Sequence, residues 1–210
     1  MTTALRTLLA EAAEWRLLEL LFSCPSPRWR HLVADLGGEV EDPELRQAAE
    51  KAVEQATEGT FHSILGPGGP APAREASYQH TVQLGYLMSE LAAYYDAFAY
   101  QRDPGEPVDH VSVEAGFLGY LRLKQAFAHA CGEDGAASVA REAADTFLRE
   151  HLVFIAEPLS TALNQSGEPY LELAGQALLR RTGPRPRQIF EILDEAAAEQ
   201  DESIFECGVS

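Results

Sequence analysis

The sequence predicts an all-α protein, a single globular domain of about eight or nine helices. Apolar residues recur at intervals of three and four along almost the whole chain, whereas strict alternation over the length of a strand is hard to find. The chain has 210 residues, which is enough to bury one sizeable core without metals or crosslinks. No internal repeat with a fixed period occurs, so a helical solenoid is not expected.

Turn and cap signals divide the first part of the chain. A first helix carries an apolar stripe that ends with Phe22, and residues 24–27, which read Cys-Pro-Ser-Pro, terminate it. Ser26, followed by proline, is a typical N-cap for a second helix. Gly37 and Gly38 are expected to close that helix.

The same signals continue through the middle of the chain. Asp42, again before a proline, starts a third helix that is expected to run as far as Leu65. Residues 66–73 contain three prolines and three glycines, so a turn or a linker follows. An aromatic-rich helix is expected at 84–98, and a second loop covers residues 103–109.

The last part of the chain is helical again. A long helix with apolar positions at 113–127 ends at Gly132. The next helix has an apolar face over residues 139–155, and Pro158 is expected to kink or restart it. Two further helices are expected at residues 170–179 and 189–198.

The charge balance is strongly acidic. There are 33 acidic and 16 basic residues, a formal net charge of −17 at pH 7, and 46% of the residues are hydrophobic. The hydrophobic content excludes a disordered chain, and the negative field repels phosphate backbones and anionic lipid headgroups. Nucleic acid and membrane surfaces are therefore poor partners, whereas a cationic peptide would be attracted.

Much of this charge lies at the C-terminus, and we divide the chain accordingly into a helical domain, 1–195, and an acidic tail, 196–210. The tail is either a solvated end or an arm that binds a partner, and like-charge runs usually stay solvated. The last 20 residues contain no basic group and the following acidic ones: Glu191, Asp194, Glu195, Glu199, Asp201, Glu202 and Glu206.

Cysteine usage and hydropathy point to the cytoplasm. Cys24, Cys131 and Cys207 are odd in number, widely spaced and without a CxxC pair, as is typical of a reducing compartment. The first apolar stretch is interrupted by charged residues and does not resemble a signal peptide. No stretch approaches about 18 apolar residues, so stable membrane insertion is not expected.

Sequence motifs for catalysis are missing. There is no GxxxxGK[ST] loop, no GxGxxG, no GxSxG and no HExxH, and the histidines are scattered without an i, i+4 pair. We therefore expect no catalytic residues, no metal ligands and no bound cofactor. The alternative is a metal-dependent helical hydrolase that uses Asp109, His110 and Glu114.

Two segments are not explained by helix packing. The first, residues 65–68, reads Leu-Gly-Pro-Gly and is followed by Pro72, Glu75 and Tyr78. The second, residues 106–110, reads Glu-Pro-Val-Asp-His and leads directly into an amphipathic helix.

Together these segments resemble the TorD, DmsD and NarJ family of chaperones for molybdenum-containing oxidoreductases. That family is all-helical, about this long, and typically carries a Gly-Pro-Gly loop, a Glu-Ser-x-Tyr element and a Glu-Pro-x-Asp-His signature. Residues 17–22 before Pro25 are similar to its first helix, and Phe147 with His151 is similar to its Phe-x-x-x-His-Leu pattern. The chain departs from the pattern in reading Glu-Ala-Ser-Tyr, preceded by Arg74 where an aromatic residue often stands.

The resemblance implies a cytoplasmic, non-enzymatic chaperone, monomeric or homodimeric. Such a protein binds the twin-arginine signal peptide and the apo-form of a molybdopterin oxidoreductase catalytic subunit, assists cofactor insertion and prevents premature export. The signal presents two guanidinium groups beside an apolar stretch, so its receptor should combine carboxylates with an aromatic-lined groove. The residues expected to bind the peptide are Glu106, Pro107, Asp109, His110, Glu75, Tyr78, Tyr94 and Tyr95, and those expected to shape the loop are Gly66, Pro67 and Gly68.

Several of these residues also suit purely structural roles. Asp109 could cap the helix that follows by accepting the amide N–H of Val111 or Ser112. Tyr94 and Tyr95 lie on a helical stripe that is typical of core residues. A third interpretation is a scaffold whose acidic tail is the functional part.

Overall fold

Helices account for most of the structure. The computed structural model describes residues 2–79 and 82–185, which form one all-α domain, as predicted, with no strand in those ranges. A 3₁₀ turn spans Glu75–Ser77, and a π-helical segment spans Leu148–Leu152. The α-helices are α1 (Thr3–Leu21), α2 (Pro27–Glu39), α3 (Pro43–Gln55), α4 (Glu58–Leu65), α5 (Leu84–Ala97), α6 (Val111–Cys131), α7 (Asp134–Phe147), α8 (Val153–Leu163) and α9 (Pro169–Thr182).

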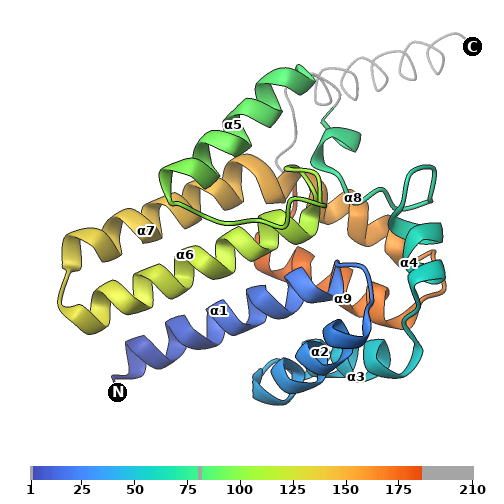
Figure 1. Ribbon diagram of the computed structural model, residues 1–210, viewed down its shortest axis with the longest axis horizontal. Helices are drawn as coiled ribbons and strands as arrows, with labels where there is room; N and C mark the ends of the chain where they lie inside the picture. Colours follow the sequence, from blue (N-terminus) through green and yellow to red (C-terminus); the bar gives the residue numbers. More distant parts are fainter. Residues whose placement is uncertain (1, 80–81, 186–210) are drawn as a thin grey trace, which may run out of the picture.

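Helix α6 lies at the centre of the molecule, between α1 and α7 (Figure 1). Gly119 allows the close approach of α1, because a Cβ at this position would lie 3.2 Å from the carbonyl oxygen of Ala12. Helix α9 packs against α3 and α8, and α2 packs against α3. None of the helices in the described ranges is both long and apolar enough to cross a membrane.

Phe117 of α6 is the centre of an aromatic cluster that attaches α5 to the core. Its side chain is fully buried, and edge-to-face or tilted ring contacts of this kind add to the free energy of burial. The distances between ring centroids are 6.4 Å to Tyr94, 5.0 Å to Tyr95, 6.0 Å to Phe98, 5.3 Å to Tyr100 and 4.8 Å to Phe147.

The predicted starts of the second and third helices are confirmed. The Ser26 hydroxyl accepts the amide N–H of Trp29 (3.2 Å), and the Asp42 carboxylate accepts those of Glu44 (2.9 Å) and Leu45 (3.1 Å). These bonds satisfy amide groups that the first turn of a helix leaves without partners.

The predicted end of the second helix is wrong. Helix α2 continues through Gly37 and Gly38 to Glu39. A Cβ at Gly37 would lie 2.6 Å from the Cβ of Ala49, so glycine is needed here for close packing of α2 on α3. The glycine therefore serves a helix contact instead of a helix end.

The prediction of one helix from Asp42 to Leu65 is also wrong. Helix α3 ends at Gln55, and α4 begins at Glu58 after the chain turns. Thr57 caps the new helix, since its hydroxyl accepts the amide N–H of Thr60 (3.1 Å). A new helix therefore begins at the Thr57 cap, although the apolar pattern continues across it.

The chain does not restart its helix at Pro158. This residue lies inside α8, and the irregularity lies upstream, where the π-helical segment 148–152 joins α7 to α8. Short π-helical turns inside α-helices are rare and occur frequently at functional sites.

Two arginines at the end of α9 fasten it to the first helices. Arg181 donates to the carboxylates of Glu14 (2.8 Å) and Asp42 (2.9 Å), and Arg180 pairs with Asp42 (3.3 Å). Partial burial alone would raise the pKa of Asp42, but the Leu45 N–H and the Arg181 guanidinium outweigh it and lower the pKa to about 2. These contacts are consistent with a structural role for the arginine pair.

The predicted helix at 189–198 and the acidic tail at 196–210, with Cys207, lie outside the described residues.

Candidate functional site

The two segments that helix packing does not explain pair with each other through their backbones. The amide N–H of Glu75 donates to the carbonyl oxygen of Asp109 (2.9 Å), and that of Val111 donates to the carbonyl oxygen of Ala73 (2.8 Å). The two bonds flank an isolated antiparallel β-bridge between Arg74 and His110. Residues far apart in the sequence are thus held in one place.

Arg74 and Asp109 form the ionic contact of this junction. The Nε and Nη2 atoms of Arg74 lie 2.8 and 2.7 Å from Oδ1 of Asp109, and the Ala76 amide N–H donates to Oδ2 (3.3 Å). The carboxylate is completely buried, while 44% of the Arg74 side chain is exposed. Arg74, the departure from the family pattern, therefore compensates the buried charge of Asp109.

Asp109 does not cap α6, because His110 occupies the N-cap position. Nδ1 of His110 accepts the amide N–H (3.3 Å) and faces the hydroxyl (2.7 Å) of Ser112. Burial, opposed by Asp109 and assisted by Arg74, lowers the pKa of His110 to about 4. The neutral ring then carries its proton on Nε2, which lies 3.8 Å from a carboxylate oxygen of Glu106.

A buried polar cluster lies beneath this junction. Glu75 accepts a hydrogen bond from the Gln79 amide, and its carboxylate lies 3.2 Å from Nδ1 of His151. The fully buried carboxyl group of Glu114 lies beside that of Glu75. Burial, with added repulsion from Glu75 and Asp109, raises the pKa of Glu114 well above its usual value. Burial therefore favours the protonated, uncharged form of Glu114.

A cavity of about 500 Å³ opens on the outer side of the same junction. Its walls are mostly apolar, and both unexplained segments contribute to them. The lining residues are Phe61, His62, Leu65, Gly66, Pro67, Gly68, Pro72, Ala73, Arg74, Ser77, Gly105, Glu106, Pro107 and His110.

The shape of one wall depends on two glycines. Gly68 has a φ of +83°, which side-chain-bearing residues rarely adopt. A Cβ at Gly66 would lie 2.3 Å from the carbonyl oxygen of His62, which is closer than atoms can approach. Glycine at both positions allows the chain to turn back sharply after α4 and so to form this wall.

Glu106 supplies the carboxylate of the cavity. It is the one acidic residue among those that line it, and 27% of its side chain is exposed. Burial and the nearby charge of Asp103 raise the pKa of Glu106, and His62 partly opposes this shift. An incoming guanidinium would stabilise the ionised form of this carboxylate.

The three tyrosines expected near the peptide do not line the cavity. Tyr95 is buried and donates its hydroxyl to the Val108 carbonyl oxygen (2.9 Å). Tyr94 donates to the carboxylate of Glu150 (2.8 Å). The Tyr78 hydroxyl has no partner, and burial raises its pKa to about 12.

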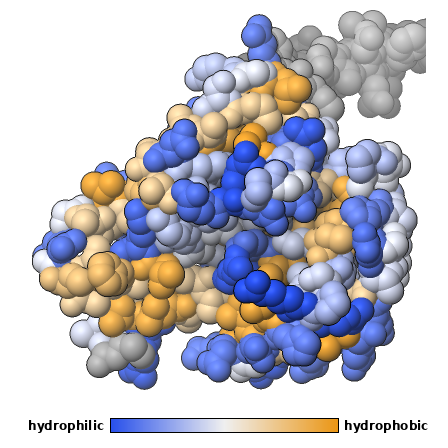
Figure 2. Space-filling model, viewed as in Figure 1, coloured by the Kyte–Doolittle hydropathy of each residue, from blue (hydrophilic) through white to orange (hydrophobic). Residues whose placement is uncertain are grey.

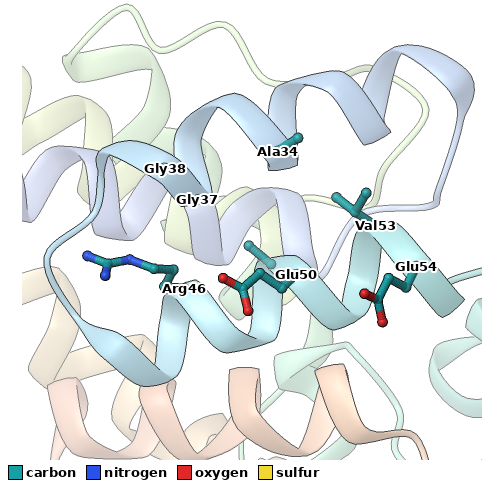
Figure 3. A pocket seen from close by; sticks show the side chains of 8 residues that line it. Ala34, Gly37, Gly38, Arg46, Glu50, Val53 and Glu54 are labelled. Atoms are coloured by element: carbon teal, nitrogen blue, oxygen red, sulfur yellow. The ribbon is translucent and has the colours of Figure 1, made fainter.

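Two other hollows are lined by none of the residues from the unexplained segments. One, of about 340 Å³, lies between α2 and α3, where Glu50 and Glu54 project beside it (Figure 3). The other, of about 430 Å³, is largely apolar and lies between α1 and α6. Figure 2 shows apolar side chains gathered on this part of the surface.

The hydrolase alternative gains no support from the geometry. Asp109, His110 and Glu114 do not bring three ligand atoms within 4.8 Å of one another, whereas two other groups of described residues do. The raised pKa of Glu114 also opposes a ligand role, because metal ligands must be deprotonated.

Sequence reasoning missed the partners of the predicted residues. Gln79 and Glu114 carry no motif, and Arg74 was noted only as a departure from a pattern. Among these missed contacts, the pairing of His151 with Glu75 had a signal, since both belong to elements of the family resemblance.

A family model described as nitrate reductase delta subunit matches residues 29–157, more than half of the chain. The chain belongs to this family. The matched range includes the paired segments, the cavity and His151, so the family pattern and the site coincide. The nitrate reductase delta subunit family consists of chaperones for the maturation of molybdoenzymes. No curated protein matches the chain.

Proposed function

We propose that this member of the nitrate reductase delta subunit family binds the twin-arginine signal peptide of a molybdopterin oxidoreductase catalytic subunit. The cavity between residues 66–68 and 105–107 is the proposed binding site. In this role the protein acts in the cytoplasm, holds the apo-subunit while its cofactor is inserted and delays export. This role is non-enzymatic.

The observation that carries the proposal is one partly exposed carboxylate at the edge of an apolar cavity. Glu106 can accept a guanidinium, while Phe61, Leu65 and Pro107 offer contacts for the apolar residues beside it. The neutral His110 can donate its Nε2–H to a peptide carbonyl oxygen. A cationic and apolar peptide matches this combination, and the net charge of −17 attracts it.

The buried residues then act on the peptide indirectly. Asp109 and Glu75 are fully buried, so we assign them to holding the two walls of the cavity together. Tyr78, Tyr94 and Tyr95 support the core beside these walls. Peptide contact is thus assigned to Glu106, Pro107 and His110.

Calorimetric titration with a twin-arginine signal peptide tests this function. We expect binding that weakens about tenfold or more when Glu106 becomes Gln, because a charge-assisted hydrogen bond is lost. A twin-lysine peptide should bind less tightly, since an ammonium cannot form the bidentate contact. Glu50→Gln, in the hollow between α2 and α3, is the matched control and should bind like the wild type. Equal affinity of Glu106→Gln and wild type would contradict the assignment.

A further inference from the structure

His151 has one buried ring nitrogen that the chaperone role leaves unused. Its side chain is 1% exposed, and Nδ1 faces the Glu75 carboxylate at 3.2 Å. Nε2 is also buried but has no hydrogen-bond partner. Because Glu75 accepts the proton on Nδ1, the lone pair of a neutral His151 ring lies on Nε2. An unpartnered lone pair in the interior is costly unless a ligand uses it.

Two carboxylates converge on this imidazole from different elements. Glu90 of α5 and Glu150 of the π-helical segment each bring an oxygen within 4.8 Å of a ring nitrogen of His151 and of each other. Because Nδ1 already faces Glu75, we take Nε2 as the nitrogen that a ligand would use. One ring nitrogen and two carboxylate oxygens thus lie within 4.8 Å of one another.

The surroundings orient these side chains as they do in metal sites. A histidine that binds a metal almost always donates its other ring N–H to a carboxylate or carbonyl group, which is the relation of His151 to Glu75. Tyr94 holds Glu150 through its hydroxyl (2.8 Å), and its ring stands edge-on to the His151 ring at 5.6 Å. Glu150 and His151 are consecutive residues of the π-helical segment.

We propose that Glu90, Glu150 and His151 bind a divalent first-row transition cation. One imidazole and two carboxylates suit the series from Mn²⁺ to Zn²⁺, without the thiolates that select softer ions. Three protein ligands leave coordination positions for water. The ion would link α5 to the junction of α7 and α8. Without the ion, α5 contacts this junction through Tyr94 and Tyr95.

Titration of the full chain with ZnCl₂ and with MnCl₂ in a calorimeter tests the site. We expect one equivalent of Zn²⁺ to bind, more tightly than Mn²⁺, and to raise the melting temperature. Glu90→Gln and Glu150→Gln should each weaken Zn²⁺ binding at least about tenfold and abolish the thermal shift. Both substitutions lie at partly or fully exposed positions, and circular dichroism verifies that the variants fold.

Glu58→Gln is the matched control, because Glu58 belongs to a second group, with Cys24 and His62, whose ligand atoms also approach within 4.8 Å. It should leave Zn²⁺ affinity unchanged. His151→Gln should abolish binding if it folds, and the two glutamate variants decide the matter if it does not. No binding by the wild type, or the same affinity in both glutamate variants as in wild type, would overturn the proposal.

Discussion

Two stretches of α6 are both buried but have contrasting surroundings. The stretch around Phe117 and Leu121 lies against aromatic and aliphatic side chains. The first turn carries Glu114, which is also fully buried but has two carboxyl groups as neighbours. Apolar burial stabilises the fold, whereas burial of an ionisable acid costs free energy.

The polar first turn of α6 lies beneath the cavity that we propose as the peptide site. There the Arg74–Asp109 ion pair and the backbone bridge hold the two loops together. Polar contacts have directional geometry, so they fix the position of the loops more narrowly than apolar packing would. The apolar stretch of α6 therefore stabilises the domain, whereas its first turn positions the site.

The largest effect is expected in the apolar stretch of α6. Phe117→Ala removes the ring that five other aromatic rings contact, and we expect the free energy of unfolding to fall by about 3–5 kcal/mol. Urea denaturation measures this loss. Phe127→Ala, at a position that is 68% exposed on the same helix, is the control and should change stability by about 0.5 kcal/mol or less. A similar loss in both variants would refute the central role of Phe117.

A smaller loss is expected where Asp109 joins the loops. Asp109→Ala removes the acceptor of Arg74 and of the Ala76 amide, which should lower the free energy of unfolding by about 2–3 kcal/mol. Arg74 is partly exposed and can turn to water, which limits the effect. A double-mutant cycle with Arg74→Ala measures the coupling between the two side chains. Strictly additive effects would show that the ion pair contributes nothing.

The smallest effect should have the opposite sign. Glu114 is protonated in the folded state at a pH where it ionises in the unfolded state, so its contribution to stability falls as pH rises above about 4.5. Glu114→Gln removes this penalty, and we expect it to raise the free energy of unfolding by about 1 kcal/mol at pH 7. The gain over wild type should vanish near pH 4. A gain in stability that does not change with pH would contradict a raised pKa of Glu114 in the folded state.

Local signals were sufficient for most of the fold. Ser26 and Asp42 act as predicted caps because a side-chain oxygen next to a helix start has one dominant use. Gly37 was misread because a glycine that ends a helix and one that permits close packing look alike until the neighbouring helix is known. Thr57 was missed because the apolar pattern of α3 continues into α4 without interruption.

The site was predictable only in part, since its geometry depends on contacts between distant segments. The sequence marked Glu106 and the Gly-Pro-Gly loop, but their meeting around one cavity required the tertiary structure. Glu75 and Asp109 carry charge and were therefore expected at the surface with the peptide. Their burial depends on Arg74 and His151, which lie 35 and 76 residues away from their respective partners.

The most direct test of the account is the position of a bound signal peptide. A photoreactive residue placed at Pro67, on the exposed wall of the cavity, should crosslink to a twin-arginine signal peptide. The same residue at Ala34, in the hollow between α2 and α3, should not (Figure 3). Mass spectrometry of the two products gives the yield and the crosslinked residue. Crosslinking at Ala34 and none at Pro67 would contradict the proposed site.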